Sequence, residues 1–321
     1  MVVRRRQGRA AAMNVLTSLS PSSQNVEAIF HLWMIALAIF GLIFLLVTGL
    51  VVYSLMKYRW REGDPDPEQV PGQKTVEIVW TAIPLGIVTL LFLLTVRTMG
   101  VSDPAPAPEP DLVVIGHQWW WEARYPKSGV VTANEIHIPT GKPFSVLLDS
   151  ADVLHEFWVA KLARKMTTVP GHPNHIWLEA DEPGSYLGSC SEFCGTEHAW
   201  MRFTVVAETP AEYAAWQSAQ LQASTPPSTD EGLRGEQLFM QMSCVNCHAI
   251  NGTTAHAHVG PDLTHLAGRS QIGSGMLDNT PDNLRRWLRN PQLVKPGAEM
   301  PNFEFTEDQV NALTAYLETL R

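Results

Sequence analysis

Two long apolar stretches near the start of the chain constrain its fold more than any other feature. Residues 29–53 read IFHLWMIALAIFGLIFLLVTGLVVY and residues 78–96 read IVWTAIPLGIVTLLFLLTV, without a formal charge in either. A helix of about 20 apolar residues crosses a hydrocarbon core of roughly 30 Å. Both stretches are therefore predicted to span a membrane, and residues 1–100 to form an N-terminal segment with a two-helix transmembrane hairpin.

Basic residues close to these stretches predict their orientation. Four of them lie between the two spans, near the helix ends: Lys57, Arg59, Arg61 and Lys74. Because short cytoplasmic loops are enriched in Lys and Arg, we expect the hairpin loop inside and residues after 100 on the outer side of a bacterial-type plasma membrane. An Arg-rich cytoplasmic tail at residues 4–9 is the alternative. No cleavable signal with its own short apolar core is visible, so the first span is expected to be a retained anchor.

Two Pro-rich stretches, SDPAPAPEPD and ASTPPSTD, divide the remaining chain. Between them, short apolar segments such as NEIHIP, KPFSVLLDS and MRFTVVA alternate with turn residues, and DLVVIGHQWWWEARY is interpreted as one more strand. This pattern predicts an all-β sandwich over residues 101–222. After residue 230, apolar residues recur at helical spacing, so residues 223–321 are predicted to be a linker and a small all-α domain.

Charge is unevenly distributed along this multi-domain chain. Residues 101–230 carry 7 basic and 16 acidic side chains, whereas residues 1–100 carry 9 and 6. An acidic outer domain repels nucleic acid and attracts basic partners, so nucleic-acid binding is excluded. A solvated acidic surface without a partner is the alternative interpretation.

The segment CSEFCGTEHAWM, residues 190–201, carries Cys190, Cys194, His198 and Met201. In an oxidising compartment a Cys190–Cys194 disulfide is one interpretation. Zinc is a second, but a thioether is a poor zinc ligand. Thiolate, imidazole and thioether together favour copper, and two cysteines on one loop would bridge two metal ions. His155, some 35 residues upstream in DVLHEFWV, offers a further ligand.

His155 followed by C-S-E-x-C-G-x-x-H-x-x-M resembles the dinuclear CuA centre of cytochrome c oxidase subunit II. The hairpin, the GHQWWWEARYP stretch and the acidic β-rich segment agree with it, so the resemblance spans roughly residues 25–215. It implies a cupredoxin-like domain that binds two copper ions and docks on oxidase subunit I. The implied copper ligands are the bridging thiolates of Cys190 and Cys194, the imidazoles of His155 and His198, the weak ligand Met201 and the main-chain carbonyl of Glu192.

The resemblance assigns roles to three further side chains. It implies that the Glu192 carboxylate reaches a magnesium ion shared with subunit I. Aligned on the G-H-Q-W start, Trp119 is the residue through which electrons enter, with Trp121 next on the same strand face; sandwich core is the alternative. KTVEIVWTAIP resembles the family's helix start, where Glu77 would lie near a proton path, unless it is an ordinary boundary carboxylate.

One segment departs from the family pattern. The family commonly has K-x-D-x-x-P-G-R between the first His and the cysteine loop, whereas KMTTVPGHPN has Thr167 for the Asp and His172 for the Arg. Neither position is a copper ligand in the family. The departure puts in doubt the polar network toward the haem propionates of subunit I.

The helical tail carries CVNCH, residues 244–248, which indicates a covalent haem c with Cys244 and Cys247 as thioethers and His248 as iron ligand. A thioredoxin-like CxxC would need a βαβ context. The domain resembles small class I cytochromes c, which makes Met300 the sixth ligand and Met276 its competitor; a Met/His pair raises the haem potential. The remaining histidines of this domain are expected on the surface, with a role as iron ligand as the alternative: His256, His258 and His265.

Together these features resemble subunit II of caa(3)-type haem–copper oxidases. The implied function is to accept electrons on haem c from a donor, either a cytochrome c or a quinol-oxidising complex, and to pass them through CuA to subunit I. Dioxygen reduction and most proton translocation are expected there, since His31 is the only histidine in either span. A membrane-tethered electron carrier for another reductase and a thioredoxin-type copper chaperone are the alternatives, and two spans favour docking on a larger membrane subunit.

Overall fold

A computed structural model describes residues 19–66, 69 and 71–321. The arginines at residues 4–9 lie outside the described part. Contacts divide the described residues into two compact units. One is Glu27–Pro104, and the other combines residues 19–26 with Ala105–Arg321.

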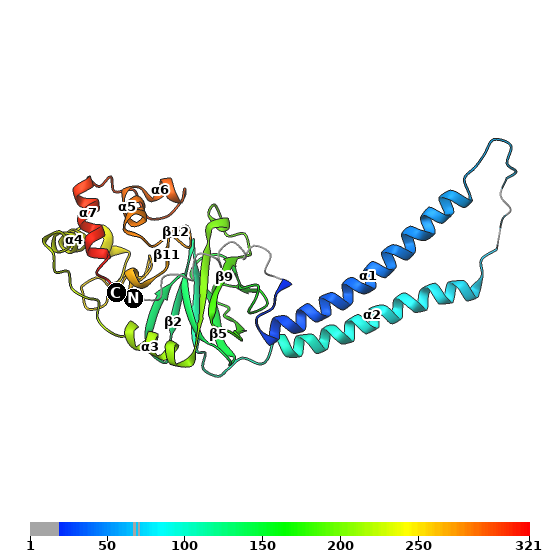
Figure 1. Ribbon diagram of the computed structural model, residues 1–321, viewed down its shortest axis with the longest axis horizontal. Helices are drawn as coiled ribbons and strands as arrows, with labels where there is room; N and C mark the ends of the chain where they lie inside the picture. Colours follow the sequence, from blue (N-terminus) through cyan, green and yellow to red (C-terminus); the bar gives the residue numbers. More distant parts are fainter. Residues whose placement is uncertain (1–18, 67–68, 70) are drawn as a thin grey trace. The chain divides into compact units, whose positions relative to one another are not determined.

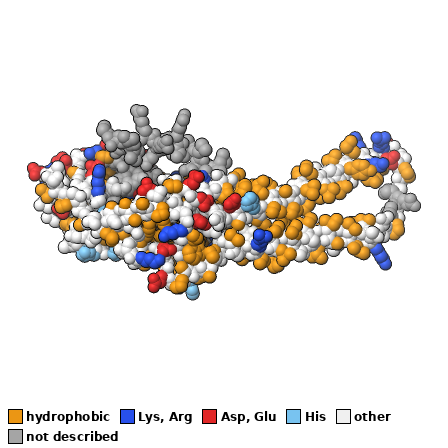
Figure 2. All heavy atoms as spheres, turned by 60° about the horizontal axis from the view of Figure 1, so that its bottom comes forward, with side chains coloured by type: hydrophobic (Ala, Val, Ile, Leu, Met, Phe, Trp, Pro, Cys, Tyr) orange, Lys and Arg blue, Asp and Glu red, His pale blue; other side chains and the backbone are white. Residues whose placement is uncertain are grey.

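The first unit is a pair of long helices, α1 (Gln24–Lys57) and α2 (Lys74–Ser102) (Figure 1). They contain both predicted spans. At 1.5 Å per residue, their 34 and 29 residues correspond to about 51 and 44 Å, more than the roughly 30 Å of a hydrocarbon core. Apolar side chains cover the helices, and basic ones gather at the hairpin end (Figure 2). Both helices are long and apolar enough to cross a membrane.

The second unit begins with a sandwich of two five-stranded sheets. In the first sheet the spatial order is β3 (Val130–Ala133), β2 (Trp120–Tyr125), β1 (Leu112–His117), β5 (Phe144–Ser150), β8 (Asn174–Leu178). In the second it is β4 (Glu135–Pro139), β10 (Arg202–Glu208), β9 (Gly184–Cys190), β6 (His155–Trp158), β7 (Met166–Thr168). The β1–β5 and β10–β4 pairs are parallel, and the other pairs are antiparallel. This confirms the predicted sandwich.

The tryptophan stretch departs from the expectation of a single strand. β1 and β2 form an antiparallel hairpin in which His117 pairs with Trp120, and Gln118 and Trp119 form the turn. An unbroken strand over residues 111–125 would be about 50 Å long, far longer than its neighbours. Folding back lets both halves bury apolar side chains in one sheet, among them Val114 and Trp121. The prediction that Trp119 and Trp121 share a strand face is therefore wrong.

Helix α3 (Pro210–Gln220), which the strand-rich pattern did not predict, follows β10. It begins with a capping box, in which the Thr209 side chain accepts from the Glu212 N–H and the Glu212 carboxylate accepts from the Thr209 N–H. The His137 ring of β4 stacks on Trp216 with 4.1 Å between ring centroids. The helix thereby covers one end of the sandwich.

The chain ends in the predicted all-α domain. Its main helices are α4 (Asp230–Gln241), α5 (Pro281–Arg289), the short α6 (Pro291–Val294) and α7 (Glu307–Leu317). Between α4 and α5 lie η3 (Ser243–Asn246), η4 (Leu266–Gly268) and the strands β11 (Gln271–Ile272) and β12 (Leu277–Asp278). α4 packs closely against α7 at Gly235. A Cβ at this position would lie 1.9 Å from the Ala312 carbonyl oxygen, so only glycine fits there. The apolar core between them contains Phe239, Leu313 and Tyr316.

Candidate functional site

The cysteine loop is fixed at both ends by the second sheet. Cys190 is the last residue of β9, and Met201 directly precedes β10. The Cys190 N–H donates to the Met201 carbonyl at 3.0 Å, which closes the base of the loop. His155 starts β6, the neighbour of β9, and Phe157 pairs with Cys190. Backbone pairing therefore places the distant histidine beside the first cysteine.

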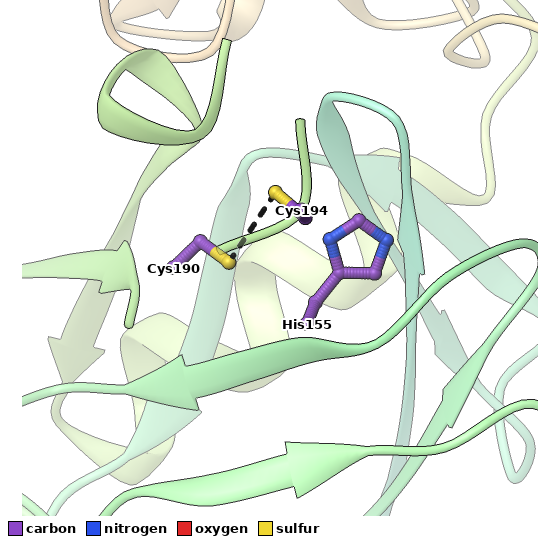
Figure 3. Close-up of side chains that lie close together, drawn as sticks. All are labelled: His155, Cys190 and Cys194. Carbon is purple, nitrogen blue, oxygen red and sulfur yellow. Dashed lines mark hydrogen bonds between the residues drawn. The ribbon is translucent and has the colours of Figure 1, made fainter. Parts of the chain in front are cut away.

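Sulfur and nitrogen donors converge at this edge of the sandwich (Figure 3). The Sγ atoms of Cys190 and Cys194 lie 3.8 Å apart, and the ligand atoms of these two residues and of His155 all lie within 4.8 Å of one another. Cys194 Sγ lies 3.7 Å from His198 Nδ1 and 3.8 Å from Met201 Sδ. These are five of the residues that the sequence predicted, and the sheet brings them together.

The sixth predicted ligand atom is a main-chain carbonyl. The Cys190 thiol donates to the Glu192 carbonyl at 3.2 Å, so that oxygen faces the sulfur cluster. The Glu192 side chain is exposed. The Glu192 carbonyl therefore faces the predicted copper ligands, and its carboxylate is exposed, as a magnesium site shared with another subunit would require.

The chemistry of the donors fits a soft metal ion. Both cysteines are free thiols and buried, so the disulfide alternative does not describe this structure. His155 is fully buried; its Nε2 lies 2.8 Å from Asp152 Oδ1, whereas its Nδ1 has no hydrogen-bond partner. Buried ring nitrogens are rarely left unpaired, and a carboxylate on one nitrogen is how proteins orient a metal-binding imidazole. The Nδ1 lone pair is thus available to an ion beside the two sulfurs.

The two thiols also influence each other's ionisation. A hydrogen bond from the Cys194 thiol lowers the pKa of Cys190 to about 3, and the same bond raises the pKa of Cys194 well above its usual range. One thiolate therefore forms readily, while a second at 3.8 Å needs added positive charge. A bound cation supplies that charge, because coordination deprotonates a thiol.

Trp119 lies directly against the cysteine loop. Its Nε1 donates to the Cys194 carbonyl at 3.0 Å, and Gln118 Nε2 donates to the same oxygen at 2.7 Å. The Gln118 N–H donates to Asp152, the carboxylate that holds His155. The turn at residues 118–119 is thereby bonded to one predicted metal-binding residue, Cys194, and through Asp152 to a second, His155.

The other two tryptophans of the stretch are buried. Trp121 is fully buried, with the rings of Phe157 and Phe203 at centroid distances of 5.6 and 5.5 Å. Trp120 is buried and stacks on His117. Of these two side chains, only Trp121 belongs to the sandwich core.

A cavity of about 490 Å³ lies mainly in the helical domain, and Trp119, Trp120 and Glu197 of the sandwich domain also line it. Cys244, Cys247, His248 and Met300 all line it. The rest of its wall is largely apolar and includes Phe239, Leu284, Leu288, Phe303, Phe305, Leu313 and Leu317. This wall suits a large flat apolar group attached through the two cysteines.

The orientation of His248 also fits an iron ligand. Its Nδ1 lies 2.7 Å from the Pro261 carbonyl, which leaves Nε2 free to bind a metal. A Cβ at Gly260 would lie 2.6 Å from His248 Cε1, so this position allows no side chain. Burial is the main cause that lowers the pKa of His248, which favours the neutral ligand form.

The sulfur of Met300 lies inside the same cavity system. It accepts a hydrogen bond from Trp287 Nε1 at 3.1 Å, and both residues line the cavity. Among the described residues that line it, Met276 does not occur. Of the two predicted candidates for a sixth ligand, only Met300 shares the cavity with His248.

One expectation about the remaining histidines is wrong. His256 and His258 are exposed, but His265 is buried, with its Nε2 2.9 Å from the Gln220 carbonyl. Gln220 ends α3, so this histidine packs against the end of the sandwich domain. The prediction of an exposed His265 is wrong because its partner, Gln220, lies 45 residues away, and local sequence patterns do not indicate such contacts.

Three other sequence-derived positions are Glu77, Thr167 and His172. Glu77 is an exposed residue in the first turn of α2. Thr167 lies in β7, paired with Glu156, and its carbonyl accepts from Asn174 Nδ2; His172 is exposed in the following turn.

Sequence reasoning missed several residues that contact the site. Asp152 holds His155, Gln118 holds the cysteine loop, and Lys295 of the helical domain pairs with Glu197 of that loop. One hint of a special role for Lys295 was present in the sequence, because it is the only lysine after residue 165. The others are ordinary polar residues whose partners only the fold identifies.

Comparisons with known families match three parts of the chain. Residues 8–97 match "Cytochrome C oxidase subunit II, transmembrane domain", residues 129–208 match "Cytochrome C oxidase subunit II, periplasmic domain", and residues 233–321 match "Cytochrome c". A copper centre is implied by the second family and a haem by the third. The donor set and the cavity described above lie in those two parts.

Individual relatives extend over nearly the whole chain. Cytochrome c oxidase subunit 2 of Alkalihalophilus pseudofirmus is 37% identical over 95% of this chain and 91% of its own length, and that of Bacillus sp. strain PS3 is 31% identical over 95% and 92%. A crystal structure of the periplasmic domain of subunit II of cytochrome oxidase from Bradyrhizobium japonicum is 29% identical, with a TM-score of 0.33, over 35% of this chain and 95% of that one. The chain therefore belongs to the cytochrome c oxidase subunit II family, anchored in a membrane by its N-terminal helices and carrying a cytochrome c domain at its C-terminal end.

Proposed function

We propose that this chain accepts electrons on a haem c and passes them through a dinuclear CuA centre to subunit I of a caa(3)-type oxidase. There dioxygen is reduced to water, coupled to proton translocation. One observation carries the proposal: Trp119 lines the cavity of Cys244, Cys247 and His248, and its indole also donates to the Cys194 carbonyl. A single side chain thus contacts both candidate sites.

Copper bound at the cysteine loop would supply a one-electron carrier. Two sulfurs that share an ion at distances of about 2.3 Å lie at most about 4.6 Å apart, and the observed 3.8 Å is within that limit. Cys190 and Cys194 would bridge two copper ions, and His155 and His198 would each bind one. Met201 and the Glu192 carbonyl would be the weaker ligands, and the exposed Glu192 carboxylate would reach a magnesium ion shared with subunit I.

The haem site involves the predicted C-x-x-C-H residues. Cys244 and Cys247 would form thioethers to the porphyrin, and His248 and Met300 would bind the iron. The hydrogen bond from Trp287 to the Met300 sulfur fixes that side chain at the cavity wall. A Met/His pair raises the haem potential, which suits electron transfer toward the oxidase.

The membrane part would dock the chain on its partner subunits. Residues 1–100 would form the hairpin segment, 101–222 the copper-binding domain, and 223–321 the linker and cytochrome c domain. The soluble domains would face the periplasm, where a cytochrome c or a quinol-oxidising complex would reduce the haem. Glu77 would lie near the entrance of a proton path in subunit I.

The test is to purify the membrane complex with this chain and to record its reduced-minus-oxidised spectrum and copper paramagnetic resonance, before and after Cys194→Ser. We expect a mixed-valence dinuclear copper signal that the variant lacks, together with bands of haem c and of additional haem in subunit I. Ser191→Ala, in the same loop, is the control and should keep the copper signal. A c-type band without dinuclear copper or a co-purifying haem subunit would instead identify a tethered cytochrome.

A further inference from the structure

One lysine of the cytochrome c domain is buried against the copper-binding domain. Lys295 is 4% exposed, and its Nζ lies 3.0 Å from the carboxylate of Glu197, which is 1% exposed. The same Nζ donates to the Trp119 carbonyl at 2.8 Å and to Ser274 Oγ at 3.4 Å. An ammonium has three N–H donors, so each has an acceptor here. A buried charge persists only when it is paired in this way.

The partners of Lys295 belong to the proposed electron path. Glu197 lies in the cysteine loop between Cys194 and His198, and Trp119 bonds to Cys194 through its indole. On its own side, Lys295 directly follows α6 and precedes Met300 by five residues. One ammonium therefore connects the loop of the proposed iron ligand with the loop of the proposed copper ligands.

Ser274 strengthens the same contact. Its hydroxyl donates to the Trp119 carbonyl at 2.9 Å, so that oxygen accepts two bonds from the cytochrome c domain. Ser274 has φ 59°, between Gly273 and Gly275, which are also in the left-handed region. Few residues other than glycine adopt this conformation. Ser274, which bonds to the Trp119 carbonyl, therefore has an uncommon left-handed backbone conformation.

Close backbone contacts surround this polar cluster. A Cβ at Gly297 would lie 3.3 Å from Thr196 Cγ2, and a Cβ at Gly275 would lie 3.2 Å from the Cβ of Arg202. Thr196 belongs to the cysteine loop, and Arg202 directly follows Met201. The cytochrome c domain therefore rests on the loop itself, with its backbone near van der Waals distance.

We propose that Lys295 is a positioning residue that fixes the cytochrome c domain on the copper loop. This inference rests on the proposed function and adds to it a fixed docking geometry, in which Trp119 lies between the haem cavity and Cys194. A haem held by His248 and Met300 would supply one electron to copper held by the cysteine loop, so that iron would be oxidised and copper reduced without a covalent bond formed or broken. An external donor then meets the haem, because the cytochrome c domain already covers Trp119.

The experiment compares Lys295→Met and Ser274→Ala in the intact membrane complex. Arg289→Met is the control, since it breaks an exposed ion pair with Glu307 in the same domain. Flash-induced electron transfer from haem to copper is measured at increasing solvent viscosity. Hydrogen–deuterium exchange is measured at residues 195–197 and 273–275. The exchange readout is independent of electron transfer, and its segment 273–275 lies outside the proposed copper loop.

In the wild type and in Arg289→Met, we expect a rate that does not depend on viscosity and slow exchange at both segments. Lys295→Met is expected to slow the transfer at least about tenfold, because a buried charge pair loses one partner. Its rate should also fall with viscosity, since the domain must first find its docked position. Exchange should accelerate at both segments, and Ser274→Ala should shift every readout in the same direction by a smaller factor.

Unchanged rate, viscosity dependence and exchange in Lys295→Met, with normal haem and copper spectra, would overturn the inference. If that variant fails to bind copper, Ser274→Ala decides, because it leaves Glu197 of the copper loop paired with Lys295; wild-type values there would equally overturn it. A wild-type complex without any haem-to-copper transfer would contradict the proposed function instead. The exchange data would then still test the docking role of Lys295.

Discussion

The cysteine loop and the C-x-x-C-H cavity prepare for their cofactors in opposite ways. At the loop, the donor atoms of His155, Cys190 and Cys194 are already within 4.8 Å of one another, and strands β6, β9 and β10 hold the ends of the site. In the helical domain, the predicted ligands line a volume of about 490 Å³ among apolar side chains. The cysteine loop places its donor atoms beside a hydrophobic core that is already filled by side chains. The helical domain instead has a core that leaves space for a large group.

The difference reflects the size of what each region would bind. A metal ion replaces hydrogen bonds between a few donors, so the surrounding sheet can be stable without it. A haem contributes apolar surface to the interior of a small domain, so its binding free energy is also folding free energy. The contrast predicts that removing the two cofactors has unequal consequences for stability.

The largest effect is expected for Cys244→Ser combined with Cys247→Ser, which prevents covalent haem attachment. The haem would bury much of the apolar wall of this cavity, so its loss should cost a large part of the stability of the domain. Hydrogen exchange in α4 and α7 should therefore lose its protection. Ser243→Ala, an exposed neighbour, should retain it. Full protection in the double variant would remove the distinction between the two regions.

Trp121→Ala is expected to cost about 3 to 5 kcal/mol, because a fully buried indole is removed from between Phe157 and Phe203. Trp119→Ala should cost less, since Trp119 is half-buried in the turn, but it should slow electron transfer. Equilibrium denaturation and flash kinetics of both variants separate these effects. A larger stability loss for Trp119→Ala would mean that the turn, rather than the sandwich core, holds the site.

Met300→Leu tests the ligand choice in the cavity. Leu and Met have similar volumes, so the stability cost should stay below about 1.5 kcal/mol. The haem potential should fall, because the thioether that raises it is lost. A redox titration measures this, and Met276→Leu is the matched control with an unchanged potential. The reverse result would make Met276 the ligand.

Cys194→Ser should abolish copper binding yet destabilise the sandwich by only about 1 kcal/mol, as expected for a substitution at a site that the core does not depend on. Metal analysis and hydrogen exchange in β9 and β10 measure the two quantities. If protection in those strands collapsed together with copper loss, the copper would be as integral to its domain as the haem is to the other.

The smallest effect concerns a pH-dependent link between the two regions. Burial alone lowers the pKa of His137, but hydrogen bonds to Glu135 and Glu208 raise it overall above its ordinary 6.5. Trp216 stacks on its ring, and the Tyr125 hydroxyl bonds to its backbone. Glu135 also accepts from the Ser270 N–H of the helical domain at 2.9 Å.

Since the folded-state pKa of His137 is raised, its contribution to stability is complete below pH 6.5 and is lost as pH rises through the raised value. Hydrogen exchange near Ser270 should thus accelerate with pH beyond the intrinsic trend, and His137→Gln should remove this excess. His256→Gln, at an exposed position, should leave it unchanged. An excess that persists in His137→Gln would assign the dependence to another group.

Local patterns were sufficient for the architecture. The uncharged apolar runs predicted α1 and α2, alternation predicted the sandwich, and helical spacing predicted α4, α5 and α7. They failed where the chain reverses within an apolar run, as at Gln118 and Trp119. Periodicity is the same on both sides of such a turn, so only strand pairing reveals it.

The sequence by itself determined which atoms are offered as ligands, because C-x-x-x-C, H-x-x-M and C-x-x-C-H hold their side chains within a few residues of one another. The roles of those side chains remain predictions. The tertiary structure alone decided that Trp119 reaches Cys194 across 75 residues and that Lys295 reaches Trp119 across 176. Such contacts depend on how whole sheets and helices pack. Because their free energy comes from many residues of the interface, no local sequence motif predicts them.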